Sequence, residues 1–412
     1  MKILFLSQLF PYPLDSGAKI KTYQALRFLS QQHRITLLTF IRNERERSYL
    51  AELKNICHEV KTCDLRRSHV RDAITIASAF FTGQSAIVKR DYLPQMQALV
   101  EETLANHEFD VIHVDRLQMA QYVPAHPAAT LVLDQHNVES EIIGHLAGSA
   151  AGLKKRLLKL EYRNLRRFEG RAGARFQHII CVSENDRCQL QTLINEAGSD
   201  SPASPAMHVV PIGVDCAAIR PLNIAKEPGR LLFLGPLNWP PNAEAVMWFA
   251  REILPAIRRQ CPQAKLRVVG DRAPRQLRKM ALTAGIEMVG YVADILPELA
   301  AAQVMVVPLR AGSGLRVKIL TAMAAGLTVV STPVGYSGIC AAPNEQLLVA
   351  DTADEFAAAV ISLLNDPNLR NRLEKAGRRL AETEYDLPVV NRELAAVYDA
   401  IETRHTMFMT GK

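Results

Sequence analysis

Short runs of aliphatic and β-branched residues recur along the first half of the chain, separated by stretches long enough for a helix. Such uninterrupted runs predict strands of a parallel sheet that is covered on both faces. They lie at residues 2–7, 34–39, 59–63, 110–114, 130–134 and 178–182. A helix is expected from about Ala18 to Ser30. The pattern predicts a doubly wound α/β domain.

A second series of apolar runs and helix-length segments begins after residues 198–206, a Ser- and Pro-rich stretch that is typical of a linker. Apolar runs follow at 230–235, 266–270, 303–308, 327–332 and 347–351, with a long helix expected from about Ala243 to Gln260. We therefore expect two domains, 1–205 and 206–387, followed by a last helix at about 388–404.

The segment 303–332 combines a strand, a glycine-rich loop, a helix and a second strand. Gly312 and Gly314 let the backbone approach a ligand closely at the carboxyl end of the first strand. The following helix directs its unpaired N–H groups at the same place, and Arg316 and Lys318 add two cations. This predicts a phosphate or diphosphate site. The alternative is a tight connection in which the two cations diverge, since residues two apart on a helix do not face each other.

The segment resembles the donor-site signature of family 4 (group 1) retaining glycosyltransferases, in the exopolysaccharide branch. The matching positions are Gly312, Ser313, Gly314, Arg316, Lys318, Ala322, Met323, Ala324 and Gly326. The resemblance implies a GT-B fold, in which two Rossmann-like, doubly wound parallel-sheet domains face each other across a cleft. The sugar nucleotide would bind the second domain and the acceptor the first, and the final helix would pack back on the first domain.

Two positions depart from that signature. Many relatives carry two glutamates separated by seven residues, one at the transferring sugar and one on the nucleotide ribose, where this chain has Ser313 and Thr321. A threonine hydroxyl makes single hydrogen bonds and lacks the bidentate grip of a carboxylate on a diol. The expectation is weakened nucleotide binding or lost activity.

The resemblance also implies roles for residues outside the loop. It implies catalytic roles for His136, Arg316 and Lys318. The expected donor contacts are Ser16, Gly17, Gly235, Asn238, Gly270, Gly290, Tyr291, Val292, Gly312, Ser313, Gly314, Leu315 and Thr321. Without the resemblance, Gly17 is simply a turn glycine, and His136 and His113 are hydrogen-bonded structural residues at strand ends. Trp239 either packs under its loop or lines the donor pocket.

No metal and no cofactor besides the nucleotide sugar are expected, because Asp134 and His136 have no third ligand at a convincing spacing. In many relatives the loop after the first strand of the second domain supplies an arginine and a lysine to the diphosphate. Here those places hold Pro236 and Asn242. Arg316 and Lys318 therefore remain the expected cations of the diphosphate site.

Composition supports a folded protein, with 48% hydrophobic and 22% charged residues. Seven scattered cysteines without a Cys-x-x-Cys pair favour reduced thiols and a cytoplasmic location. No apolar run approaches the roughly 18 residues of a membrane span. Residues 72–83 are apolar enough for a core helix, which we favour, or for a face that meets a lipid or an acceptor.

The net charge of +7 is concentrated in residues 151–175, where nine Lys or Arg stand against Glu161 and Glu169. This amphipathic basic helix is either a solvated surface helix or a surface attracted to an anionic membrane, with peripheral attachment at the inner face. Nucleic acid is not an expected partner, because no reader motif or aromatic stacking pattern accompanies the charge.

The expected activity is transfer of a glycosyl unit from a UDP- or GDP-sugar to a hydroxyl of a glycan or lipid-linked glycan, with retention and without metal. Two alternatives remain. Ser313 and Thr321 favour a nucleotide-sugar-binding protein without transfer activity, and the fold also serves nucleotide-sugar 2-epimerases, although those need acid and base carboxylates at the sugar.

Overall fold

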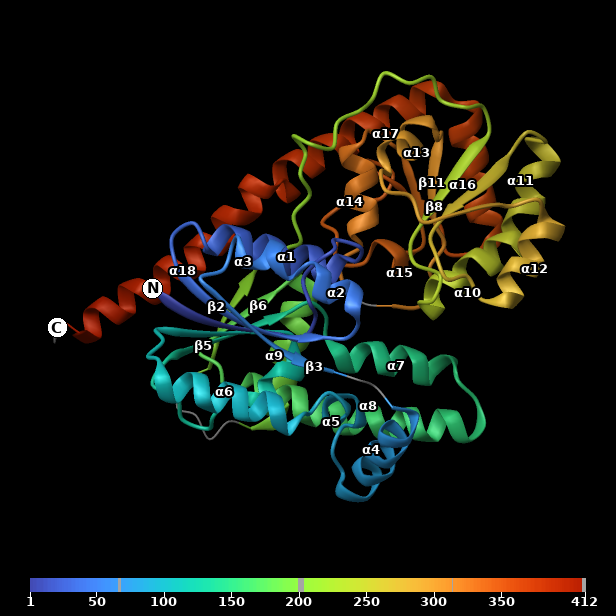
Figure 1. Cartoon of the computed structure of the whole chain (residues 1–412). Helices are drawn as coiled ribbons and strands as arrows, with labels where there is room; N and C mark the ends of the chain where they lie inside the picture. Colours follow the sequence, from blue (N-terminus) through green and yellow to red (C-terminus); the bar gives the residue numbers. More distant parts are fainter. Residues whose placement is uncertain (66–67, 199–203, 313, 410–412) are drawn as a thin grey trace. The chain divides into compact units, whose positions relative to one another are not determined.

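Two sheets, each built only of parallel strands, organise the computed structural model, which describes residues 1–65, 68–198, 204–312 and 314–409 (Figure 1). The chain divides into unit 1, residues 1–212 with 391–412, and unit 2, residues 213–390. Both sheets are doubly wound, as the apolar runs predicted.

The sheet of unit 1 has seven strands in the order β3-β2-β1-β4-β5-β6-β7. Their bounds are β1 Lys2–Ser7, β2 Arg34–Ile41, β3 Glu59–Asp64, β4 Val111–Asp115, β5 Thr130–Gln135, β6 His178–Cys181 and β7 Ala206–Val209. The strand order reverses between β1 and β4, the switch point where such sheets bind ligands beyond their carboxyl ends.

Helices cover both faces of this sheet, with α1 and α3 on one side and α6 and α8 on the other in Figure 1. The bounds are α1 Gly17–Leu29, α2 Glu44–Ser48, α3 Leu50–Lys54, α4 His69–Thr82, α5 Ala86–Arg90, α6 Pro94–Asn106, η1 Leu117–Tyr122, α7 Glu139–Ser149, α8 Gly152–Gly173 and α9 Glu184–Ala197. Leu4, Leu6, Ile112 and Leu133 lie in the core between the sheet and one helical layer.

The predicted domain boundary at 205/206 is too early in the chain. β7 pairs in parallel with β6, with Ala206 opposite His178, and is therefore the edge strand of the first sheet. The last helix, α18 Leu387–Met409, belongs to unit 1 from residue 391 onward. Local patterning could not reveal the pairing of β7, because the strand has four residues and its partner is distant in sequence.

The sheet of unit 2 has six strands in the order β10-β9-β8-β11-β12-β13. Their bounds are β8 Arg230–Leu234, β9 Lys265–Val269, β10 Glu287–Gly290, β11 Val304–Val307, β12 Val329–Ser331 and β13 Leu348–Val349. The strand order reverses between β8 and β11. Every residue of these two central strands is buried, which explains their uninterrupted apolar sequence.

The helices of unit 2 follow its strands. The bounds are α10 Pro240–Trp248, η2 Phe249–Ile253, α11 Leu254–Gln260, α12 Arg275–Ala284, α13 Leu296–Ala301, α14 Val317–Ala324, α15 Pro333–Tyr336, α16 Ala353–Asn365, α17 Pro367–Leu380 and η3 Ala381–Tyr385. The expected single helix from Ala243 to Gln260 is divided by the π-helical turn η2. Among the described residues, no helix combines the length and apolar character needed to cross a bilayer.

Candidate functional site

The glycine-rich loop of unit 2 lies at the switch point, between the carboxyl end of β11 and the start of α14. Helix α14 begins at Val317, so Arg316 is its N-cap residue and only Lys318 lies in the first turn. Gly312 and Gly314 both have positive φ, +136° and +76°. A side chain would be strained at either place, and the loop conformation therefore requires glycine. Ser313 lies outside the described residues.

Arg316 folds back over its own loop. A Cβ added at Gly312 would overlap the Arg316 guanidinium, so the glycine makes room for that cation. Gly312 is buried and Arg316 is partly buried. The Arg316 guanidinium thus lies directly against the backbone of Gly312.

Lys318 is directed toward the neighbouring strand β8. Its Nζ donates to Asn242 Oδ1 at 3.0 Å and lies 4.5 Å from the centre of the Phe233 ring. Burial, and secondarily the like charge of Arg316, lower the pKa of Lys318 to about 7. Within the described residues no carboxylate pairs with this ammonium group. An anion at this place would supply the missing negative charge.

Asn242 connects Lys318 to the loop after β8. Its amide donates to Pro236 O at 2.9 Å and accepts from Lys318, so it orients the lysine and fixes the loop after β8. Asn242, expected from the resemblance to stand in place of a cation, thus holds the lysine of α14.

Three predicted glycines meet at the carboxyl ends of β8, β9 and β10. A Cβ on Gly235 would come within 2.8 Å of Lys318 Nζ, and a Cβ on Gly270 would overlap the Gly235 carbonyl oxygen. Gly270 N donates to Gly290 O at 2.9 Å. The structure therefore brings Gly235, Gly270, Gly290 and Lys318 together along one edge of the sheet.

The other donor-site candidates of unit 2 differ in exposure. Asn238 and Tyr291 are exposed, Val292 is partly buried and Leu315 is buried. Thr321 is buried, and its hydroxyl donates to Val317 O at 2.9 Å within α14. That hydroxyl proton is already used, so Thr321 could offer a ribose only its lone pairs. Trp239 is 46% exposed.

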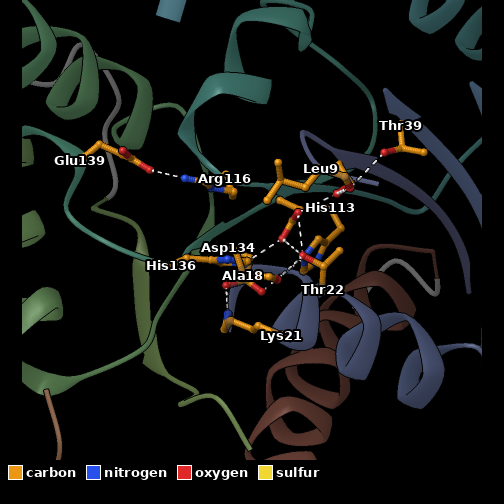
Figure 2. Close-up of polar contacts among 12 residues, drawn as sticks. Leu9, Ala18, Lys21, Thr22, Thr39, His113, Arg116, Asp134, His136 and Glu139 are labelled. Carbon is orange, nitrogen blue, oxygen red and sulfur yellow. Dashed lines mark hydrogen bonds and ion pairs between the residues drawn. The ribbon is translucent and has the colours of Figure 1, made fainter. Parts of the chain in front are cut away.

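A second polar group of residues lies at the switch point of unit 1. We call it the carboxylate cluster, and it consists of Ser7, Lys21, Thr22, Asp115, Asp134 and His136 (Figure 2). All six residues are buried. They come from the ends of β1, β4 and β5 and from one face of α1.

Asp115 is the most heavily bonded member of the carboxylate cluster. It accepts from Ser7 Oγ at 2.8 Å and from Thr22 Oγ1 at 3.0 Å, and His136 Nε2 lies 2.8 Å from its Oδ1. Burial alone would raise the pKa of Asp115, but the charge and hydrogen bond of His136 hold it below its ordinary value. The predicted catalytic histidine is thus positioned by a carboxylate on the next strand.

Asp134 pairs with the Lys21 ammonium group, and both side chains are almost completely buried. Burial would raise the pKa of Asp134, but the Lys21 charge, together with the contacts of His113 and His136, lowers it below its ordinary value. His113 Nε2 is 3.7 Å from Asp134, and its Nδ1 is 2.7 Å from the Tyr398 hydroxyl on α18. His113 also stacks on Phe5. It has the contacts of a structural residue.

The carboxylate cluster contains the residue types of a metal site. One ligand atom each of Asp115, Asp134 and His136 lies within 4.8 Å of the others. Asp115 is the third group that sequence spacing did not reveal, because parallel pairing of β4 and β5 places it beside Asp134. However, Lys21 and His136 already face the two carboxylates. A divalent cation would have to compete with the Lys21 ammonium group.

Sequence reasoning missed Lys21, Thr22 and Ser7. The signal that could have found them is positional, since Ser7 and Asp115 end the two strands that flank the switch point. The predicted residues Ser16 and Gly17 mark the start of α1, where Ser16 is the N-cap without a side-chain capping bond.

Part of the chain matches a known family, and most of it aligns with a curated relative. Residues 228–366 match the family model described as glycosyl transferases group 1. A phosphatidyl-myo-inositol mannosyltransferase of Mycolicibacterium smegmatis is 27% identical over 85% of this chain and 88% of its own length.

Solved structures show the same fold. An Anabaena protein, Alr3699/HepE, in complex with UDP and glucose, has a TM-score of 0.68 at 16% identity and covers 97% of this chain and 100% of its own. Sucrose-phosphate synthase from Thermosynechococcus elongatus has a TM-score of 0.72 at 16% identity, covering 98% and 99%. The predicted GT-B fold class and the resemblance to group 1 glycosyltransferases are confirmed.

Proposed function

Starting from the match of residues 228–366 with the glycosyl transferases group 1, we propose that this chain transfers a sugar from a nucleoside-diphosphate sugar to an acceptor hydroxyl. The acceptor would be a glycan or a lipid-linked glycan, the anomeric configuration would be retained and no metal would take part. The chain would act in the cytoplasm.

The observation that supports this proposal most is the placement of two cations against glycine. Arg316 lies over Gly312, and Lys318 lies beside Gly235, at the start of α14. The first N–H groups of a helix have no partner within the helix, and they favour negative charge. Cations, N–H groups and side-chain-free backbone are what a diphosphate requires.

The same groups suit the chemistry. As the bond between the anomeric carbon and the diphosphate oxygen breaks, negative charge grows on the leaving diphosphate. Preorganised cations and N–H dipoles stabilise that charge in the transition state. The acceptor oxygen would form its new bond to the anomeric carbon on the same face, and its proton would pass to the departing phosphate oxygen. This route needs no covalent nucleophile.

His136 would contact the transferring sugar, as the resemblance implies. Its Nε2 is held by Asp115, which is in turn fixed by Ser7 and Thr22. A ring held in this way has one orientation, which suits positioning a sugar hydroxyl. Ser16 and Gly17, at the start of α1, would contact the donor phosphates.

Relatives guide the choice of donor. One structural neighbour, Anabaena Alr3699/HepE, was solved both with UDP and glucose and with UDP-glucose, and a sequence relative is a mannosyltransferase. We therefore place UDP- and GDP-hexoses first among the donors.

The test is to incubate the whole chain with a panel of UDP- and GDP-sugars, with and without glycan or lipid-linked acceptors, and to follow the sugar by NMR. The proposal expects nucleoside diphosphate release that depends on acceptor, and a product with the donor's anomeric configuration. Epimer formed without acceptor would establish the 2-epimerase alternative. Tight donor binding without any turnover would establish the noncatalytic one.

The variant Thr321→Glu helps to distinguish a weakened transferase from a protein that binds the donor without turnover. Thr321 occupies the place of the ribose glutamate, and its hydroxyl is engaged by Val317 O. If the donor binds in the expected orientation, a carboxylate here should raise donor affinity, measured by calorimetry. The matched control is Thr283→Glu, in which a carboxylate replaces an exposed threonine of α12 in the same unit and no gain in donor affinity is expected.

A further inference from the structure

Helix α4 turns its apolar side to the solvent. Its exposed positions include Val70, Ala73, Ile74, Ala77 and Phe81, which recur at helical spacing and form one stripe. The exposed fractions are 70% for Val70, 64% for Ile74 and 85% for Phe81. The sequence led us to favour a core helix over residues 72–83, and the exposure of this stripe corrects that prediction.

Three described polar residues of α4 occupy the opposite, partly covered side. Asp72, Thr75 and Ser78 are each partly buried, and Ala79 is fully buried. Ser78 and Thr82 direct their hydroxyls to carbonyl oxygens of α4 itself, at 3.0 and 2.8 Å. This is the reverse of a surface helix in a soluble domain, whose apolar stripe faces the core. Contiguous apolar surface of this kind marks an interaction site.

The end of α4 is fastened to the basic helix α8. Asn164 of α8 donates to Gln84 O at 3.2 Å, just after α4. Glu161 of α8 accepts from Ser85 Oγ at 2.5 Å and from the backbone N–H of Ala86 at 2.9 Å, at the start of α5. The short helix α5 packs against both α4 and α8, and so connects the two helices (Figure 1).

The surface of α8 is basic because both of its acidic residues point into the protein. Glu161 caps α5, and Glu169 is fully buried and accepts from the N–H groups of Glu139 and Ser140. The exposed charged residues of α8 are Lys154, Arg156, Lys159, Arg163, Arg167 and Arg171. Within the described part of the chain, none of these six has a carboxylate partner. Leu153 and Leu157, on the same helix, are 72% and 46% exposed.

An outward apolar stripe beside an excess of unneutralised cations fits one occupant best, the surface of an anionic lipid bilayer. Apolar side chains enter the boundary between head groups and acyl chains, while Lys and Arg attract the negative lipids. A second copy of this chain would bring equal positive charge to the same place, and the two basic helices would repel each other.

We propose that the apolar stripe of α4, together with the basic surface of α8, docks unit 1 on an anionic membrane. The inference goes beyond the transfer reaction and is independent of it, since membrane binding requires neither donor nor acceptor. It would place the acceptor-binding unit of the proposed transferase at a surface where lipid-linked acceptors reside.

The test is flotation of the whole chain with phosphatidylcholine vesicles and with mixed phosphatidylcholine and phosphatidylglycerol vesicles. Binding is expected only to the mixed vesicles and should decrease as salt is raised, because salt screens the attraction. The double change Ile74→Ser and Phe81→Ser should weaken binding more than about tenfold, since both side chains lose their apolar burial. Arg156→Gln and Arg163→Gln should each weaken it about fivefold.

Matched controls lie in unit 2. Leu282→Ser removes an apolar side chain that is 84% exposed on α12, and Arg372→Gln removes an exposed charge from α17. Both should leave vesicle binding unchanged, and the thermal unfolding midpoint should be the same in all variants. As a gain-of-signal measurement, Phe81→Trp should show a blue shift of fluorescence when phosphatidylglycerol vesicles are added.

Three results would overturn the proposal. One is no binding to phosphatidylglycerol vesicles together with no shift at residue 81. Another is binding that the α4 and α8 changes leave intact. The last is a dimer, seen by light scattering, that the Ile74 and Phe81 changes dissolve, because a second copy would then cover the stripe.

Discussion

The two sheets end in opposite chemistry at the same topological place. At the switch point of unit 1, the carboxylate cluster pairs Lys21 with Asp134 and His136 with Asp115. At the switch point of unit 2, Lys318 has an amide oxygen and an aromatic ring as partners, and the neighbouring backbone is glycine. At one edge the lysine already has a carboxylate partner, while at the other no carboxylate of the described residues pairs with Lys318.

The difference supports the proposal that unit 2 accepts the diphosphate. A buried ion pair already has its counter-charge, and an incoming anion would have to displace it against the cost of leaving a charge unpaired. A cation that lacks a carboxylate partner gains when an anion arrives, and its pKa rises as it does so. This reasoning supports the proposed roles, structural positioning for Lys21 and Asp134 and donor binding for Lys318 and Arg316.

The largest expected effect concerns the buried ion pair of Lys21 and Asp134 in unit 1. Lys21→Met leaves Asp134 buried without its ammonium partner and should cost about 3–5 kcal/mol of unfolding free energy at neutral pH. Chemical denaturation measures this. The control Lys19→Met, at a partly exposed lysine 3.2 Å from Asp15, should lose clearly less. Equal losses in the two variants would contradict the assignment.

The loss of unfolding free energy in Lys21→Met should depend on pH in a defined direction. Lys21 lowers the pKa of Asp134, so the pair contributes stability above the ordinary carboxyl pKa of about 4 and loses it as the pH falls. The difference between the parent chain and Lys21→Met should therefore shrink toward low pH.

The next largest effect concerns the proposed diphosphate site of unit 2, formed by the glycine loop, Arg316 and Lys318. Arg316→Ala should lower donor turnover about 10²–10³-fold, as for the loss of one preorganised group at a developing negative charge. Arg310→Ala is the matched control, because Arg310 lies in the same loop but pairs with Glu244 and lies over the Trp248 ring. If both variants lose activity equally, the guanidinium of Arg316 has no special role.

A smaller effect follows from the Lys318 pKa of about 7. Lys318 is charged below that pH and neutral above it, so affinity for a nucleoside diphosphate should fall by up to about tenfold per pH unit above 7. Calorimetry between about pH 7 and 9 should also detect proton uptake on binding. Lys318→Arg keeps its charge throughout this range and should flatten the profile. A flat profile in the parent chain would contradict the account.

The smallest expected effect tests whether the hydrogen bond between His113 and Tyr398 stabilises unit 1. Tyr398→Phe removes the hydroxyl that contacts His113 Nδ1 at 2.7 Å and should cost about 1 kcal/mol of unfolding free energy. Tyr291→Phe, at a residue 65% exposed, should cost nothing measurable. A Tyr398→Phe chain of unchanged stability would show that this hydrogen bond contributes nothing to unit 1.

The sequence predicted the strands of unit 1 well, because buried parallel strands are continuous apolar runs. β1 was expected at residues 2–7 and observed at Lys2–Ser7, and the next runs agree within two residues. The strand, glycine loop and helix that carry Arg316 and Lys318 were also predicted, since they are neighbours in sequence, while the role of the two cations stays a prediction. These features are local, and local pattern is what a sequence displays directly.

Non-local features were missed. The carboxylate cluster joins residues from β1, α1, β4 and β5, and only the strand order brings them together. The pairing of β7 depends on the same order. Periodicity showed that residues 72–83 could form an apolar helix, but periodicity cannot say which face the rest of the protein covers. Asn242 looked like a lost cation, and the structure shows that it holds Lys318.

The most direct test of the donor site is a crystal structure of the whole chain with UDP or GDP bound. The account predicts the diphosphate oxygens within hydrogen-bond distance of Arg316, of Lys318 and of the backbone N–H groups that begin α14. A diphosphate bound elsewhere in unit 2, with the glycine loop and both cations uninvolved, would contradict it.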